Sequence, residues 1–174
     1  TRCSTRLHTQ YAVYANAGTG ISSVSGTNWY EAGSTVTLTA SVRPGYTWSH
    51  WACSGCGGTS TYQTETIYGL DRAHYYTAYA TPNQYTYKIN PNGGKFSNGS
   101  ASVATANPNL IYETSNWYNS GGWIPNRTGY TIQGLYDKSS GGTKVFDASG
   151  LCVNGCGYWN NNLYVHVGNL TVYA

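Results

Sequence analysis

An internal repeat constrains this chain more than any other feature of its sequence. Residues 11–20 (YAVYANAGTG) open the first half, and residues 85–94 (YTYKINPNGG) open the second half in a similar way. Midway through each half, RPGYT at residues 43–47 corresponds to RTGYT at residues 127–131. The halves also close on nearly the same four letters, TAYA and TVYA. We therefore expect two tandem modules of one fold.

Apolar residues alternate with a period of two, which is typical of strands. Residues 35–42 read TVTLTASV, a β-branched run that ends before the turn signal Pro44-Gly45. Similar short runs recur along the chain, separated by Gly, Asn and Pro. This periodicity indicates little helix and predicts a β-rich fold.

The repeat predicts three parts along the chain. These are an N-terminal extension at residues 1–10, a first module at residues 11–81 and a second module at residues 82–174. The join at residues 81–84 reads TPNQ, and a proline in so short a join predicts a stiff linker.

Composition narrows the class of protein. Only 9% of residues are charged, against a usual share of about a quarter, whereas aromatic residues reach 15% with 18 Tyr and 6 Trp. Disordered chains have few aromatic residues and high net charge, so this chain is expected to fold. A surface rich in Tyr, Asn, Ser, Thr and Gly is typical of recognition faces and of secreted proteins. We expect an extracellular or cell-surface location.

The charge pattern excludes two classes of partner. The net charge is +3 and the nine Lys and Arg residues are scattered, which disfavours nucleic acid and anionic membranes. No stretch approaches the roughly 20 apolar residues of a membrane helix, so no membrane insertion is expected. The chain lacks an initial Met and a signal-like apolar region near its start, and we interpret it as a monomeric mature or excised fragment.

The five cysteines form two close pairs and one isolated residue: Cys53 and Cys56, Cys152 and Cys156, and Cys3. A redox Cys-x-x-Cys site needs a thiolate near a helix N-terminus, but Cys53 precedes the turn-forming run SGCGG. Zinc requires four ligands, for instance both pairs together or the first pair with His50. The two pairs belong to different modules, which disfavours zinc.

We therefore predict two local disulfides, Cys53–Cys56 and Cys152–Cys156, each stiffening a glycine-rich turn. Cys3 is left as a free thiol or as a partner for another chain, and its pairing with Cys53 or Cys56 remains open. We expect no metal site and no cofactor.

Catalysis is not indicated. Glycoside hydrolysis requires two carboxylates facing one another, and no motif pairs any two of the six carboxylates. The four histidines show no metal-binding spacing. The stretch DRAH at residues 71–74 is interpreted as a polar turn before the last strand of the first module. The chain is expected not to be an enzyme.

Aromatic residues are the candidate binding groups. Trp48 and Trp51 are three apart, so on a strand they face opposite sides, and the sequence leaves open which of them is exposed. Tyr46 and Tyr130 of the repeated Gly-Tyr-Thr are interpreted as core anchors. Aromatic residues beside Asn and Gly suit sugar stacking or a protein interface, although several Trp residues could equally fill the core. The candidate ligand-binding residues are Trp51, Trp117, Tyr118, Trp123, Tyr158 and Trp159.

Three spaced motifs carry a family resemblance. They are INPNGG at residues 89–94, NRTGYTIQGLYDKSSGGTKVFDASG at residues 126–150 and the closing LTVYA. Through them, residues 85–174 resemble the Listeria–Bacteroides repeat, the B-repeat of internalin-type surface proteins. Residues 11–80 resemble a divergent version of the same repeat.

The resemblance implies a β-rich α+β fold of two tandem, small β-grasp-like modules, each a mixed sheet with a short helix or helical turn. The candidate helical piece lies at residues 115–119. Two features depart from the family pattern: Leu135 stands where Trp is usual, and cysteine pairs are not general in the family.

The resemblance also implies a function. The chain would be a non-catalytic tandem repeat region of a bacterial cell-surface or secreted protein, acting as an adhesive or stalk module. Its partner would be a host or neighbouring-cell protein or glycan. The alternative is a carbohydrate-binding module attached to a glycan-degrading enzyme.

Overall fold

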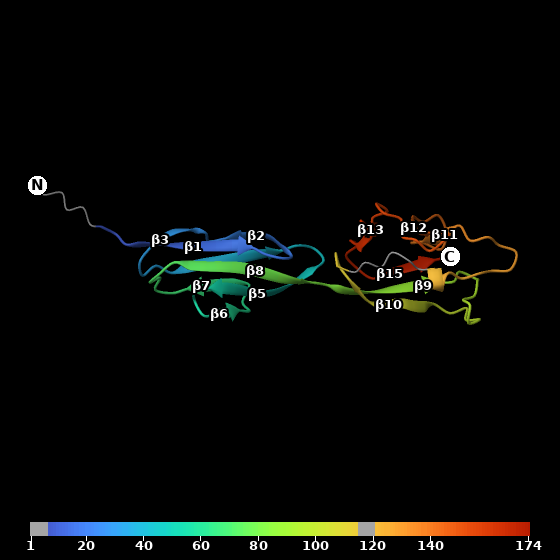
Figure 1. Ribbon diagram of the computed structural model, residues 1–174, viewed down its shortest axis with the longest axis horizontal. Coiled ribbons are helices and arrows are strands. Elements are labelled where there is room, and N and C mark those ends of the chain that lie inside the picture. The colour runs from blue at the N-terminus through green and yellow to red at the C-terminus, as the bar shows by residue number, and fades with distance from the viewer. Residues whose placement is uncertain (1–6, 115–120) are drawn as a thin grey trace, which may run out of the picture. The chain divides into compact units, whose positions relative to one another are not determined.

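The computed structural model describes residues 7–114 and 121–174. The chain divides into two compact units, Thr1–Thr81 and Pro82–Ala174, each with its own hydrophobic core (Figure 1). The division falls within the proline-containing join at residues 81–84, where the repeat places the module boundary.

Unit 1 is built on a five-stranded mixed sheet. Its strands, in spatial order, are β3 (Asn28–Glu31), β1 (Gln10–Ala17), β8 (His74–Pro82), β5 (Tyr46–Ser54) and β6 (Gly58–Ser60). The first and last strands of the unit, β1 and β8, lie side by side and run parallel, from the pair Val13–His74 to the pair Ala17–Ala78. β3 pairs with β1, and β6 with β5, in the antiparallel sense.

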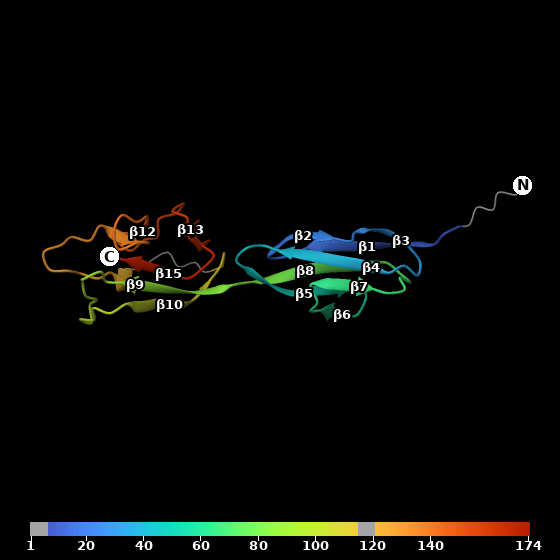
Figure 2. The same cartoon turned by 180° about the vertical axis from the view of Figure 1, so that it is seen from behind.

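The second layer of unit 1 is also a sheet. β2 (Ile21–Ser25), β4 (Val36–Val42) and β7 (Thr64–Ile67) form an antiparallel sheet in the order β2-β4-β7 (Figure 2). Along β4, buried and exposed residues alternate as the sequence predicts. The buried side chains of both sheets share one core. The helix expected for this module is therefore wrong for residues 7–81, because the alternating chain covers the main sheet with strands.

Unit 2 contains a second five-stranded mixed sheet. Its spatial order is β10 (Ala104–Ile111), β9 (Gln84–Asn90), β15 (Leu170–Tyr173), β11 (Gly134–Tyr136) and β12 (Lys144–Asp147). Here too the first and last strands, β9 and β15, are parallel neighbours, from Tyr87–Leu170 to Asn90–Tyr173. A separate hairpin of β13 (Trp159–Asn160) and β14 (Leu163–Tyr164) supplies two aromatic rings to the core.

The two main sheets share one plan. In each, an antiparallel partner flanks the first strand. The last strand lies next to β5, which begins within the repeated Gly-Tyr-Thr motif, in unit 1 and next to β11, which follows that motif, in unit 2. The prediction of a β-rich fold with mixed sheets is confirmed. Among the described residues, helix is limited to the 3-10 turn Gly121–Trp123, and residues 115–119, the predicted helical piece, lie outside them. No helix in the described part of the chain is long and apolar enough to cross a membrane.

The repeated Arg-x-Gly-Tyr sequence forms the same tight turn in both units, at residues 43–46 and 127–130. In each turn the tyrosine N–H donates to the arginine carbonyl, at 3.2 Å and 3.0 Å. The glycine in the third position has φ of 83° and 81°, a conformation that type II turns require and that glycine adopts without steric cost. The repeat is thus preserved in backbone geometry.

Tyr164 predicts an alkaline weakness in unit 2. Its side chain is fully buried and its hydroxyl donates to the Gly168 carbonyl at 2.7 Å. Burial, followed by the nearby Tyr158 and Tyr85, raises the pKa of Tyr164 well above the ordinary value of about 10. Above about pH 10 the unfolded chain loses this proton while the folded unit keeps it, so the free energy of unfolding falls as pH rises, by up to about 1.4 kcal/mol per pH unit.

The measurement is urea unfolding of unit 2 at a series of pH values from neutral into the alkaline range. Tyr164→Phe should be less stable at neutral pH by about 1 kcal/mol, through the lost hydrogen bond, and should show a shallower alkaline decline. Tyr62→Phe, at a 76% exposed position in unit 1, is the matched control and should decline as the wild type does. Equal slopes for wild type and Tyr164→Phe would contradict the prediction.

Candidate functional site

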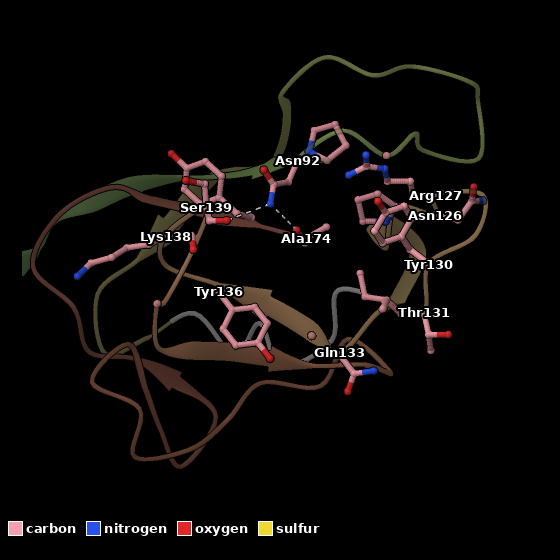
Figure 3. A pocket seen from close by; sticks show the side chains of 18 of the residues that line it. Asn92, Asn126, Arg127, Tyr130, Thr131, Gln133, Tyr136, Lys138, Ser139 and Ala174 are labelled. Atoms are coloured by element: carbon pink, nitrogen blue, oxygen red, sulfur yellow. Dashed lines mark hydrogen bonds between the residues drawn. The ribbon is translucent and has the colours of Figure 1, made fainter.

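A groove of about 700 Å³ lies at one end of the sheet in unit 2 (Figure 3). Four segments form its walls: the turn after β9, the loop that contains the repeated turn, the connection between β11 and β12, and the end of β15. Three of these segments carry the motifs Asn-Gly-Gly, Arg-Thr-Gly-Tyr and Tyr-Ala, so the groove gathers the second half's repeat signature on one surface.

Asn92 joins three of the walls. Its backbone is left-handed, with φ of 49°, and its N–H donates to Oδ1 of Asn90 at 2.9 Å. Its side-chain Nδ2 donates to the carbonyl of Ser139 at 3.2 Å and to that of Ala174 at 2.8 Å (Figure 3). Asn is among the few residues that tolerate this backbone conformation while bonding locally. Asn92 thereby fixes the spacing of the walls.

The glycines after Asn92 allow two wall segments to approach closely. A Cβ on Gly94 would lie 2.7 Å from the Asn126 carbonyl oxygen, and one on Gly93 would lie 3.1 Å from the Arg127 guanidinium. Gly93 also has φ of 89°, which favours glycine. The Asn-Gly-Gly motif is thus explained by backbone packing at the groove.

Tyr130 presents an aromatic face at the groove. Its side chain is 67% exposed, and the Arg127 guanidinium carbon lies 4.2 Å from its ring centroid, within the range of a cation–π interaction. Tyr136 also lines the groove, is half-buried and has Lys144 Nζ 5.8 Å from its ring. The interpretation of Tyr130 as a core anchor is wrong, because the turn ends before the sheet begins and leaves the ring outside the core.

The lining is suited to noncovalent binding. It combines phenol rings, a guanidinium, an ammonium from Lys138, and the amides of Asn92, Asn126 and Gln133. Among the described residues that line the groove, none contributes a carboxylate, imidazole or thiol side chain. Aromatic faces beside convergent hydrogen-bonding groups are the chemistry of a binding site for polar ligands.

The four predicted ligand-binding residues that the structure describes do not line this groove. Trp51 and Trp159 are fully buried, one in each core, which corrects their interpretation as surface platforms. Trp123 is 36% exposed and packs its ring edge-on against Phe96. Tyr158 is half-buried and donates its hydroxyl to Asp137 at 3.0 Å. The remaining two candidates, Trp117 and Tyr118, lie outside the described residues.

The direction of each side chain on β5 decides which of its two tryptophans is more exposed. Trp51 faces the core, where its ring packs edge-on against Trp48 and Tyr76. Trp48 is only partly buried, and its Nε1 donates to the carbonyl of Thr61 at 2.7 Å. Trp48 is therefore the more accessible of the pair.

The first predicted disulfide is present. Cys53 and Cys56 are bonded across the turn between β5 and β6, with their Cα atoms 5.6 Å apart, within the usual range for a disulfide. Gly55 and Gly57 in this turn have φ of 86° and 78°, which lets the chain reverse tightly enough to bring the cysteines together.

The second predicted disulfide is wrong, since Cys152 and Cys156 are free thiols. Cys152 Sγ donates instead to Oδ1 of Asn162 at 3.3 Å, and both cysteine side chains pack against the core of unit 2. Burial, with the neighbouring Cys156 second, raises the pKa of Cys152. Cys3 lies outside the described residues.

Several groove residues belong to the repeat motifs found in the sequence, but no ligand-binding role was predicted for them. The available signal was that Asn92 and Arg127-Thr128-Gly129-Tyr130 belong to turns, because turn residues lie at the surface where ligands bind. Comparison of the chain with protein-family models, curated proteins and solved structures finds no match.

The difference between groove and core aromatics predicts losses of stability that differ in size. Trp159→Ala should lower the free energy of unfolding of unit 2 by about 3–5 kcal/mol, through the cavity it leaves. Tyr130→Ala removes only an exposed ring and one cation–π contact, and should cost about 1 kcal/mol or less. Urea unfolding followed by far-UV circular dichroism measures both. A Tyr130→Ala variant as unstable as Trp159→Ala would place Tyr130 in the core.

Proposed function

We propose that this chain is a non-catalytic tandem module of a bacterial cell-surface or secreted protein, and that it adheres to its ligand through the groove of unit 2. The observation that carries the proposal is the lining of that groove, in which phenol rings, amides and cationic groups converge. The ligand is a polar group on a host or neighbouring-cell protein or glycan.

Three properties of the groove support adhesion rather than a purely structural role. Its walls are held in position by hydrogen bonds of Asn92, so it is largely pre-formed, which reduces the entropy lost on binding. The Tyr130 ring is exposed and oriented by Arg127, and a rigid aromatic face gives contact area at low entropic cost. The cationic groups favour a ligand that bears a carboxylate or sulfate.

The fold supports the proposed relationship to B-repeats in one respect. Both units place their first and last strands as parallel neighbours in the middle of a small mixed sheet, an arrangement compatible with a β-grasp-like module. In unit 1, a three-stranded sheet takes the place of the helix as the covering layer. We accordingly propose a β-grasp-like sheet with a β cover for unit 1.

The second candidate function is a carbohydrate-binding module attached to a glycan-degrading enzyme. The exposed Tyr130 ring beside the amides of Asn126 and Gln133 favours it, because sugar rings stack on aromatic faces and their hydroxyls bond to amides. Both candidates use the same groove and differ in the origin of the ligand.

Binding assays on a glycan array, on insoluble plant and microbial polysaccharides, and on cultured host cells test the proposal. Tyr130→Ala should weaken saturable binding by about tenfold or more, as expected for an aromatic hot spot. The matched control is Tyr68→Ala, which removes a 78% exposed tyrosine from unit 1 and should bind as the wild type does.

The class of ligand distinguishes the two candidates. Groove-dependent binding to host-type glycans or to cell-surface protein supports adhesion, whereas groove-dependent binding to degradable polysaccharide supports the carbohydrate-binding module. If neither Tyr130→Ala nor Tyr68→Ala changes the binding, the result would contradict a role for the groove.

A further inference from the structure

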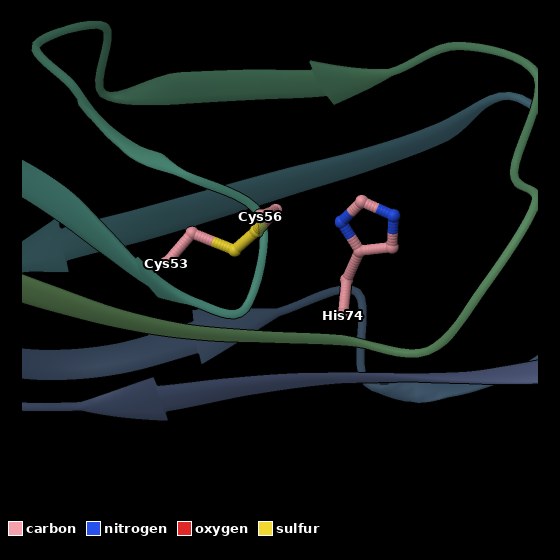
Figure 4. A group of neighbouring side chains, drawn as sticks. All are labelled: Cys53, Cys56 and His74. Carbon is pink, nitrogen blue, oxygen red and sulfur yellow. A yellow bond between two sulfur atoms is a disulfide. The ribbon is translucent and has the colours of Figure 1, made fainter.

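Three metal-binding side chains meet in unit 1, away from the groove. Cys53 and Cys56 belong to the end of β5 and the turn that follows, and His74 is the first residue of β8, the neighbour of β5 in the sheet. One ligand atom from each of the three side chains lies within 4.8 Å of the other two (Figure 4). Within the described part of the chain, this is the one such cluster of three.

His74 is the unusual member of the cluster. Its side chain is 7% exposed, and its Nδ1 is fully buried without a hydrogen-bond partner. Figure 4 shows a nitrogen of its ring facing the cysteine pair. An unpaired buried polar atom costs about 1–3 kcal/mol, so its position beside two sulfur atoms requires an explanation other than stability.

The ionisation of His74 suits a ligand role. Burial lowers the pKa of His74 below its ordinary value, Arg72 lowers it further, and Asp71 opposes the effect. A lowered pKa favours the neutral imidazole, which is the form that binds metal ions. The same stretch, residues 71–74, was interpreted from the sequence as a polar turn alone.

We propose that reduction of the Cys53–Cys56 disulfide converts this cluster into a binding site for one Zn²⁺ ion, with Cys53, Cys56 and His74 as its protein ligands. A dithiol reductant supplies two electrons and two protons, which break the S–S bond and form two thiols while the reductant becomes a disulfide. Zinc then binds both sulfurs as thiolates, and the two thiol protons pass to solvent. The oxidised form has no thiolate and does not bind the ion.

The distances fit this conversion. Zinc bonds of about 2.3 Å to sulfur and about 2.0 Å to nitrogen place tetrahedral ligand atoms roughly 3.5–4 Å apart. The three ligand atoms already lie within 4.8 Å of one another, so small side-chain movements are sufficient once the S–S bond is broken. Both cysteines are partly exposed, which gives the reductant and the ion access.

A small cavity provides the fourth position. It has a volume of about 190 Å³, is lined by both cysteines, and also contacts Ser60, Glu65 and Tyr76. Tetrahedral zinc with three protein ligands takes water in its fourth position, and the cavity has room for that water. The Glu65 carboxylate accepts a hydrogen bond from Ser60 and faces the same space.

Cobalt titration tests the site, because Co²⁺ replaces Zn²⁺ in thiolate sites and reports its ligands by absorption. The full chain, reduced with a dithiol, should bind one Co²⁺ with thiolate charge-transfer bands and the visible bands of tetrahedral cobalt. Zn²⁺ added to the cobalt form should abolish these bands. Zn²⁺ added to the metal-free reduced chain should release about two protons per ion near neutral pH. The oxidised chain should show no bands.

Variants assign the ligands. His74→Asn should weaken Zn²⁺ binding by at least about tenfold, since even loss of an outer partner of a ligand costs about 10–100-fold. His50→Gln is the matched control, because His50 stacks on Tyr79 at 5.2 Å and is not in the cluster. Cys152→Ser/Cys156→Ser, which removes the free thiols of unit 2, should leave the cobalt spectrum unchanged.

Several results would overturn the proposal. They are the absence of cobalt bands in the reduced chain, bands of equal intensity in the oxidised chain, and loss of the bands in Cys152→Ser/Cys156→Ser. If circular dichroism shows that His74→Asn is unfolded, the wild-type chain still tests the two cysteine ligands. Release of fewer than two protons per Zn²⁺ ion would exclude two thiolate ligands and overturn the proposal. None of these readouts depends on the ligand of the groove.

Discussion

Each unit depends on one pairing between its two ends, the parallel contact of its first and last strands. Parallel strands cannot be joined by a tight turn, so a long connection must cross over before the last strand returns beside the first. In both units part of this connection adds further strands to the same sheet. In unit 1 the returning chain forms the second layer and carries Cys53 towards the first residue of β8. In unit 2 it forms the aromatic hairpin and three of the four groove walls. The cluster of Cys53, Cys56 and His74 and the groove of unit 2 therefore both lie where this connection meets the first or the last strand.

Features set by neighbouring residues could be predicted from the sequence. The alternation in β4 follows from its period-two pattern, and the type II turns follow from Arg-x-Gly-Tyr, because both are local properties of the backbone. The same holds for the Cys53–Cys56 disulfide, which only requires a tight glycine-rich turn. The chain divides between Thr81 and Pro82, within the join that the repeat indicates.

Features set by distant residues could not be predicted in this way. Trp51 and Trp159 are core residues because other strands lie over them, which the local sequence does not specify. Tyr130 is exposed because β11 begins only at Gly134, four residues after the turn that its motif predicts. His74 approaches the cysteines only through the neighbouring positions of β5 and β8 in the sheet. The Cys152–Cys156 prediction is also wrong: Cys152 Sγ donates to Asn162, ten residues along the chain, and is not bonded to Cys156.

The parallel pairing of β1 with β8 has a mechanical consequence. If the chain is pulled at both ends, tension enters unit 1 at the start of β1 and leaves at the end of β8, so the two strands are drawn past one another lengthwise. The hydrogen bonds of the pair lie across that direction and are loaded together in shear, rather than opened one after another. β9 and β15 give unit 2 the same arrangement. A stretched chain would thus be resisted in each unit by its most central strand pair.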